Sequence, residues 1–208
     1  MDQAVIAGWT GRDPVAVEKH IVELELLGVK RPASTPIFYR VSAARLTTLD
    51  NIEVSGDASS GEVEFVLVAS GGNLFVGVGS DHTDRQVETY NVTVSKQMCD
   101  KPVAPVLWPM QDVASHWDRL ILRSYITENG ARTLYQEGEV SGMLTPADLL
   151  ARYGSGGKLA DGTLMFCGTF AAKGGIRPSP RFEFELEDPV LGRKISHAYG
   201  MTSLPVLG

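Results

Sequence analysis

The spacing of hydrophobic residues near the start of the chain predicts a helix. Asp13-Pro14 has the form of an N-cap followed by proline at the first helical position. Apolar residues then recur every three or four positions, at Val17, Ile21 and Leu24. Gly28 is a typical helix stop. We therefore expect a helix over residues 13–28.

Further along, the pattern changes to alternation, which is typical of strands. Polar and apolar residues alternate over 62–69. Asn129-Gly130 lies between two apolar runs and predicts a tight hairpin with arms at 117–125 and 132–136. Thr145-Pro146 starts a second capped helix that ends near Gly154. Further strands are expected at 37–41, 74–79, 163–166 and 181–186.

Strands thus outnumber helices, and hairpins dominate the order of elements. This predicts a strand-rich α+β fold, built as a mixed sheet or irregular barrel with a few helices packed outside it. The 208 residues contain no internal repeat or long linker. We therefore expect one domain over residues 1–208, with the segment 1–35 carrying the first helix.

Composition narrows the class of protein. The net charge is -6 and the basic residues are scattered, which argues against a nucleic-acid partner. The longest apolar runs are far shorter than a bilayer crossing requires, and the start has no basic segment of the signal-peptide type. Two cysteines without a Cys-x-x-Cys spacing predict neither a disulfide framework nor a thiolate zinc site. A soluble cytoplasmic protein with no membrane partner is expected.

The sharpest chemical feature is Glu62-Val63-Glu64, because residues i and i+2 of a strand project from the same face. Two neighbouring carboxylates repel each other, and a divalent cation would neutralise them. Asp81, after the next extended run, is a candidate third ligand. Such oxygen ligands favour Mg²⁺, Mn²⁺ or Ca²⁺, although His82 leaves a softer metal open. The alternatives are a solvated strand face for the glutamates and an Asx turn or helix cap for Asp81.

Other residues carry weaker signals. His20 and Glu23 are three apart on the first helix, which suits either an acid–base pair or a surface ion pair. Lys96 is most simply a solvated lysine. Gly168-Thr169 offers N–H and hydroxyl groups to a carboxylate, or is only a tight turn. No dinucleotide, Walker or nucleophile-elbow motif is present, and His116 and His197 are expected to be structural.

Taken in order, these motifs resemble the fumarylacetoacetate hydrolase superfamily, and within it a short prokaryotic branch of unknown function. The resemblance covers about 20–187 and rests on seven segments. They are His20-x-x-Glu23, Pro36-Ile37-Phe38-Tyr39-Arg40, Glu62-x-Glu64, Asp81-His82-Thr83-Asp84-Arg85, Lys96, the hairpin Glu128-Asn129-Gly130 with Tyr135-Gln136-Glu137-Gly138, and Asp161-Gly162-Thr163 leading to Cys167-Gly168-Thr169.

The resemblance implies a β-roll fold, a homodimer and a site for Mg²⁺, or for Mn²⁺ or Ca²⁺. It implies a hydrolase that cleaves C–C bonds of small 2-oxo acids or 1,3-dicarbonyl compounds of the acylpyruvate kind, through a metal-stabilised enolate. Decarboxylase, hydratase or isomerase activity, or a non-catalytic small-molecule-binding relative, are the alternatives. The implied roles are metal binding by Glu62, Glu64 and Asp81, catalysis by His20, Glu23 and Lys96, and substrate binding by Arg40, Gln136, Gly168 and Thr169.

Three departures from the family pattern concern the ligand pocket. Phe170 stands where proline is usual, and Val17 where an aromatic residue normally precedes the histidine. The spacing from Glu64 to Asp81 is also shorter than in well-studied members. Because these differences fall at the pocket and near the metal, the family does not determine the substrate.

Overall fold

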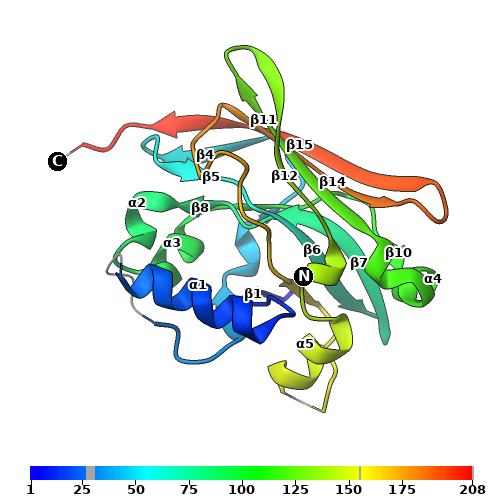
Figure 1. Cartoon of the computed structure of the whole chain (residues 1–208). Coiled ribbons are helices and arrows are strands. Elements are labelled where there is room, and N and C mark those ends of the chain that lie inside the picture. The colour runs from blue at the N-terminus through cyan, green and yellow to red at the C-terminus, as the bar shows by residue number, and fades with distance from the viewer. Residues whose placement is uncertain (27–30, 155, 208) are drawn as a thin grey trace.

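Two mixed β-sheets packed face to face make up most of the protein (Figure 1). The computed structural model describes residues 1–26, 31–154 and 156–207, without the side chains of His20, Glu23 and Leu24. The six-stranded sheet has the order β10 (Trp108–Pro109), β7 (Asn73–Ser80), β6 (Val63–Ser70), β13 (Thr163–Phe166), β1 (Gln3–Gly8) and β2 (Ile37–Val41). The five-stranded sheet has the order β12 (Ala131–Glu139), β11 (Ile121–Glu128), β14 (Arg181–Asp188), β15 (Arg193–Leu204) and β4 (Asn51–Ser55).

Each sheet is mixed because one pair of strands in it is parallel. These pairs are β1 with β13 in the larger sheet and β15 with β4 in the smaller one. Two short pairs complete the described strands, β3 (Leu46–Thr47) with β9 (Lys101–Pro102) and β5 (Ser59–Ser60) with β8 (Thr83–Asp84). Both large sheets keep free edges, so the strands described here form open sheets and not a closed barrel.

Short helices lie around the sheets (Figure 1). The α-helices are α1 (Pro14–Leu26), α2 (Arg85–Glu88), α3 (Val92–Met98), α4 (Met110–Val113) and α5 (Pro146–Tyr153). The 3₁₀ turns are η1 (Ala43–Arg45), η2 (Ala114–Arg119) and η3 (Val140–Gly142). None of the described helices has the length and apolar character that crossing a bilayer needs.

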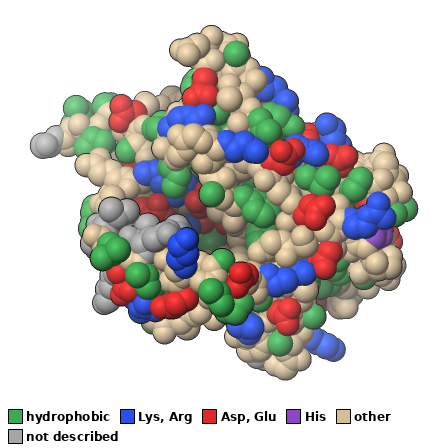
Figure 2. Space-filling model, in the orientation of Figure 1, with side chains coloured by type: hydrophobic (Ala, Val, Ile, Leu, Met, Phe, Trp, Pro, Cys, Tyr) green, Lys and Arg blue, Asp and Glu red, His purple; other side chains and the backbone are tan. Residues whose placement is uncertain are grey.

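The main hydrophobic core fills the space between the two sheets. Phe65 and Val78 reach it from the larger sheet, and Leu122, Phe184 and Tyr199 from the smaller one. A second cluster covers the opposite face of the larger sheet, around Ile6, Tyr39 and Phe166. Strands β6 and β13 are therefore buried on both faces, which explains their continuous apolar sequences. On the face of the molecule shown in Figure 2, acidic and basic side chains are interspersed.

The strand-rich α+β class and the main local elements agree with the sequence-based prediction. The Asp13 carboxylate accepts a hydrogen bond from Val15 N at 2.9 Å, as an N-cap does, and Pro14 opens α1. Strands 37–41 and 163–166 have the predicted bounds. In the hairpin turn, Asn129 and Gly130 both have positive φ, 50° and 78°, which a type I′ turn requires.

The prediction was wrong at the start of the first hairpin arm, where residues 117–119 belong to η2. Leu120 N donates to Trp117 O at 3.1 Å, and both side chains are buried. A 3₁₀ turn places residues i and i+3 on one face, so the same apolar pattern satisfies either structure. Trp117 packs edge-on against Phe65, with ring centroids 5.0 Å apart. Strands β1, β4 and β15 and helix α3 were not predicted.

Candidate metal centre

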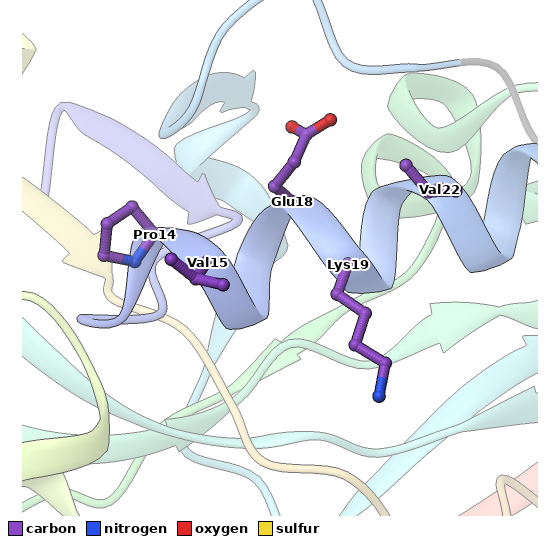
Figure 3. Close-up of a pocket in the computed structure, with 5 residues that line it drawn as sticks. All are labelled: Pro14, Val15, Glu18, Lys19 and Val22. Atoms are coloured by element: carbon purple, nitrogen blue, oxygen red, sulfur yellow. The ribbon is translucent and has the colours of Figure 1, made fainter.

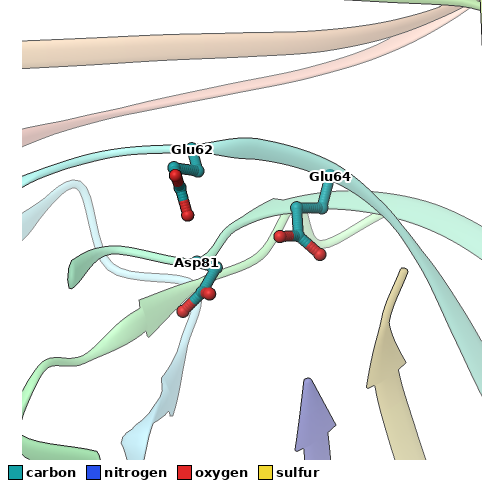
Figure 4. A group of neighbouring side chains, drawn as sticks. All are labelled: Glu62, Glu64 and Asp81. Carbon is teal, nitrogen blue, oxygen red and sulfur yellow. The ribbon is translucent and has the colours of Figure 1, made fainter. Parts of the chain in front are cut away.

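Three acidic side chains from two neighbouring strands converge on one point (Figure 4). Glu62 immediately precedes β6, Glu64 lies within it, and Asp81 immediately follows β7. Each contributes one carboxylate oxygen to a group whose members all lie within 4.8 Å of one another. The three residues that the sequence singled out as metal ligands are thus brought together.

The β6–β7 hairpin explains why they meet. The two strands are antiparallel, and Glu64 lies opposite Gly79 in their register. Beyond the last pair of the ladder, Asp81 N donates to Glu62 O at 3.0 Å, which holds the two acidic residues side by side. Gly79 has no room for a side chain, because a Cβ there would lie 2.8 Å from the Phe166 ring. Sheet pairing therefore fixes the separation of the carboxylates.

Burial makes this group costly unless cations balance it. Glu64 is 3% exposed and Asp81 0%. Burial, and after it the charge of Asp81, holds the pKa of Glu64 well above its ordinary value. Burial also acts to raise the pKa of Asp81, but Lys96 and Lys101 outweigh it and leave that pKa below its ordinary value. The two carboxyl groups therefore differ in how readily they give up a proton.

The donor set fits a hard divalent cation. Asp81 Oδ1 is buried and receives no hydrogen bond from the described residues, although Lys101 Nζ lies 3.4 Å from it. Ligand oxygens on opposite sides of an ion are about 4 Å apart for Mg²⁺ and about 5 Å apart for Ca²⁺, given their usual metal–oxygen distances. The carboxylate oxygens here all lie within 4.8 Å of one another, which does not exceed the separation for Ca²⁺. All three donors are oxygens, as Mg²⁺, Mn²⁺ and Ca²⁺ prefer.

Two lysines contact Asp81. Lys96 was predicted as a site residue from the sequence, and Lys101 was not. The Lys96 ammonium, from α3, donates a hydrogen bond to Asp81 Oδ2 and lies 3.8 Å from Glu62 Oε2. Lys101 is fully buried, and its Nζ donates to His82 O at 2.6 Å and to Cys99 O at 3.1 Å. Sequence analysis missed Lys101 because no local pattern distinguishes a buried lysine from a solvated one.

Arg85 is a third cation at the site and was also not predicted as a site residue. Its guanidinium lies 3.2 Å from Glu62 and 2.8 Å from Glu88, and its Nε donates to Ser60 Oγ at 2.7 Å. In the sequence, Arg85 lies four residues after Asp81, and this spacing was the signal that could have identified it as a site residue.

The loop after β13 supports the carboxylates. Gly168 N donates to Glu64 Oε2 at 2.7 Å, so this N–H orients a carboxylate of the protein. Thr169 Oγ1 donates to Val63 O at 2.8 Å and accepts from Gln136 Nε2 at 2.8 Å. The polar groups predicted to bind substrate at Gly168 and Thr169 thus have partners within the chain.

Gln136, from the other sheet, connects this loop to β6. Its Oε1 accepts from Val63 N at 3.0 Å and from Ser124 Oγ at 2.9 Å. Its Nε2 donates to Thr169 Oγ1 and, at 2.6 Å, to Phe170 O. The Gln136 amide is therefore fully used in positioning the two segments that carry Glu64 and its N–H donor.

Arg40 does not join the other predicted site residues. It is exposed, and its guanidinium donates to Gln3 Oε1 at 3.1 Å. Successive side chains of β2 alternate between faces, so it is the neighbouring Tyr39 that is buried. Burial raises the pKa of Tyr39.

The structure describes the side chain of His82 but not that of His20. The side chains of His20 and Glu23 lie outside the described part of the structure, so their role stays a prediction; their backbone belongs to α1. His82 is fully buried and its Nδ1 is bonded to Tyr199 Oη at 2.9 Å. Burial lowers the pKa of His82 to about 3, so its ring is neutral. It does not belong to the carboxylate group.

A surface pocket of about 580 Å³ lies on the outer side of α1 (Figure 3). It is lined by Pro14, Val15, Glu18, Lys19 and Val22 and contains none of the carboxylates. The carboxylate group, and not this pocket, carries the chemistry described above.

Solved structures with the same architecture include several enzymes. Yeast ynq8, a fumarylacetoacetate hydrolase family protein, matches with a TM-score of 0.70 and 15% identity, over 99% of this chain and 94% of that one. 2-Keto-3-deoxy-D-arabinonate dehydratase, complexed with magnesium and 2,5-dioxopentanoate, matches with a TM-score of 0.69 and 16% identity, over 99% and 74%. 4-Oxalocrotonate decarboxylase from Pseudomonas putida G7, complexed with calcium and acetate, matches with a TM-score of 0.59 and 17% identity, over 96% and 77%.

The protein therefore has the fold of the fumarylacetoacetate hydrolase superfamily, which confirms the resemblance seen in the sequence at the level of the fold. Residues 7–199 match the family described as protein of unknown function (DUF2848), and the chain belongs to that family. A search of curated proteins finds no match to this sequence.

Proposed function

We propose that this protein is a divalent-metal-dependent enzyme that acts on small 2-oxo acids or 1,3-dicarbonyl compounds, and that it hydrolyses a C–C bond in them. The observation that carries the proposal is the convergence of Glu62, Glu64 and Asp81, with a buried Asp81 oxygen that lacks a donor among the described residues. The same fold holds magnesium with 2,5-dioxopentanoate in one similar protein and calcium with acetate in another.

Glu62, Glu64 and Asp81 would hold the metal. A bound divalent cation would supply Lewis-acid polarisation of adjacent oxygens in a 2-oxo acid. With the metal bound, Lys96 and Lys101 would favour an anionic substrate, because their two ammonium groups beside Asp81 add to the positive charge of the cation in a buried site. The Gly168 N–H would keep the Glu64 carboxylate in its orientation while the substrate binds.

Hydrolysis also needs a base that activates water, and we assign this role to His20, with Glu23 orienting its ring. The pair has helical i, i+3 spacing on α1. His20 would take a proton from water, which then attacks the distal carbonyl carbon, and would later return that proton to the departing fragment. Positive charge on Lys96 would stabilise the negative charge that develops on the substrate.

The second candidate is decarboxylation or dehydration of the same kind of substrate. It is favoured by the fold shared with a decarboxylase and a dehydratase. Decarboxylation breaks a C–C bond without an attacking water, so it needs only a donor that protonates the product carbon. Product analysis separates the two: hydrolysis yields two acids or an acid and a ketone, whereas decarboxylation yields CO₂.

The decisive experiment is a turnover screen of acylpyruvates and oxaloacetate with Mg²⁺ or Mn²⁺. We expect activity that EDTA abolishes and that falls by about a hundredfold or more in Glu62→Gln and in His20→Ala. Glu53→Gln is the matched control, because Glu53 is an exposed glutamate on β4. Tight Mn²⁺ binding without turnover on any of these compounds would instead identify a non-catalytic small-molecule-binding relative.

We further propose that the enzyme works as a homodimer. Light scattering coupled to size-exclusion chromatography measures this directly, and a monomeric mass under the conditions of the turnover assay would contradict it.

A further inference from the structure

Lys96 reaches the carboxylates from helix α3, and it is buried along its length. Its side chain is 9% exposed, and with Ser95 it makes up the buried part of α3. The ammonium donates to Asp81 Oδ2 and lies 3.8 Å from Glu62 Oε2. It therefore contacts two of the three residues that would bind a metal ion.

Three cationic side chains already compensate most of the negative charge at the site. Three carboxyl groups, those of Glu62, Glu64 and Asp81, are met by three cationic side chains, those of Arg85, Lys96 and Lys101. Arg85 also pairs with Glu88 at 2.8 Å, so even with every carboxylate ionised the site keeps only one uncompensated negative charge. A divalent cation that entered would leave uncompensated positive charge in a buried place, which is costly.

Lys96 and a metal ion would also compete for the same oxygens. A divalent cation coordinates a carboxylate oxygen at about 2.0–2.6 Å, depending on the ion. The ammonium of Lys96 already occupies one Asp81 oxygen by donating a hydrogen bond to it. Two cations at neighbouring positions on one carboxylate repel each other strongly where water is excluded.

The two lysines differ in how firmly they are held. Lys101 Nζ is anchored by the carbonyl oxygens of His82 and Cys99, at 2.6 and 3.1 Å. Lys96, in contrast, donates its hydrogen bond to Asp81, which is also a candidate metal ligand. A metal ion that bound Asp81 would therefore take this partner from Lys96. A flexible four-carbon stem allows the Lys96 ammonium to withdraw without moving the backbone.

We propose that Lys96 is an internal counter-ion that competes with the divalent cation for Asp81 and Glu62, and that it thereby lowers the affinity of the site for metal. This inference rests on the metal site of the proposed function. The metal ion displaces the Lys96 ammonium from Asp81, and the displaced charge stays close to the bound metal. An anionic substrate then restores the balance of charge, which makes metal and substrate bind together.

The test is direct Mn²⁺ binding by isothermal titration calorimetry, with the full chain and without substrate. Wild type is compared with Lys96→Met, whose side chain is also unbranched, is one atom shorter and carries no charge. Lys173→Met is the matched control, because Lys173 is 52% exposed and lies 3.7 Å from Glu137, a residue outside the carboxylate group. We expect Lys96→Met to bind Mn²⁺ about tenfold or more tightly than wild type, and Lys173→Met to bind as wild type does.

Thermal unfolding supplies a second readout. Without metal, Lys96→Met leaves the carboxylates less compensated, so its melting temperature should fall. Saturating Mn²⁺ should then raise it by more than it raises that of wild type. Lys96→Arg, which keeps the charge, should show neither effect.

The outcomes separate the inference from the function on which it rests. If wild type binds Mn²⁺ and Lys96→Met binds it equally or more weakly, Lys96 is not a competitor, and the metal site stands. If neither wild type nor Lys96→Met binds Mn²⁺, both the inference and the proposed metal site are overturned.

Discussion

The backbone N–H of Gly168 donates a 2.7 Å hydrogen bond to Oε2 of Glu64. Glu64 lies on β6 and Gly168 lies two residues after the end of β13, and these two strands are antiparallel neighbours in the larger sheet. The bond holds a buried carboxylate against the start of a loop. It also partly offsets the effect of burial on Glu64, because an N–H donor favours the charged form.

Replacing Gly168 should therefore damage both the fold and the metal site. Gly168 has φ of 104°, and a Cβ there would lie 1.8 Å from Thr10 Oγ1. Gly168→Ala should lower the free energy of unfolding by about 2 kcal/mol or more, because backbone strain and a steric clash combine. Chemical denaturation measures this loss, and Mn²⁺ titration measures the accompanying loss of affinity.

Gly175→Ala is the control for backbone strain alone. Gly175 has φ of 86°, and nothing lies within 4 Å of a Cβ built there. Its substitution should cost about 1 kcal/mol and leave Mn²⁺ affinity unchanged. Equal effects of the two substitutions on Mn²⁺ affinity would show that the Gly168 N–H does not orient Glu64.

Removing the Gln136 amide should separate the two segments that it connects. Gln136→Leu leaves Val63 N and Phe170 O, both bonded to it in the wild type, without these partners. We expect a loss of about 2–4 kcal/mol in the free energy of unfolding, since buried polar groups lose hydrogen bonds. Gln111→Leu, at an exposed position on α4, is the control and should stay within about 0.5 kcal/mol of wild type. A stable Gln136→Leu variant would contradict this role.

Tyr199 ties β15 of the smaller sheet to the end of β7. Its hydroxyl lies 2.9 Å from both Ser80 Oγ and His82 Nδ1. Tyr199→Phe should lower the free energy of unfolding by about 1–3 kcal/mol, because both buried partners lose a hydrogen bond. Tyr90→Phe, at a side chain 74% exposed, should have little effect in the same denaturation assay. Equal stabilities of the two variants would disprove the link.

The raised pKa of Glu64 predicts opposite pH trends with and without metal. Without metal, the native protein retains the Glu64 proton above pH 4.5, where the unfolded chain loses it. The contribution of this group to stability therefore falls as pH rises from 4.5 towards the raised pKa. Metal binding needs the ionised form, so Mn²⁺ affinity should rise over the same interval.

Denaturation curves and Mn²⁺ titrations between pH 5 and 8 measure both trends. Metal-free Glu64→Gln lacks the ionisable group, so its stability should depend less on pH than that of wild type. Mn²⁺ affinity that stays constant over this range would mean that Glu64 is ionised before the metal arrives.

The sequence alone located the three carboxylates because they belong to one hairpin. Their relation depends on strand alternation and on pairing between neighbouring segments, and both leave local patterns. The same holds for α1, whose N-cap is written in Asp13-Pro14, and for the Asn129-Gly130 turn. Where a 3₁₀ turn and a strand bury the same residues, as at Trp117 and Leu120, the pattern did not decide between them.

Tertiary structure alone decided what surrounds the carboxylates. Lys101 and Lys96 look alike in the sequence, and only packing makes one of them fully buried at Asp81. Gln136 and Tyr199 come from the second sheet, and stacking of the two sheets brings them to the site. Such contacts depend on the arrangement of whole sheets, which side-chain periodicity does not encode. The hydrogen-bonding needs of buried polar groups then fix their partners.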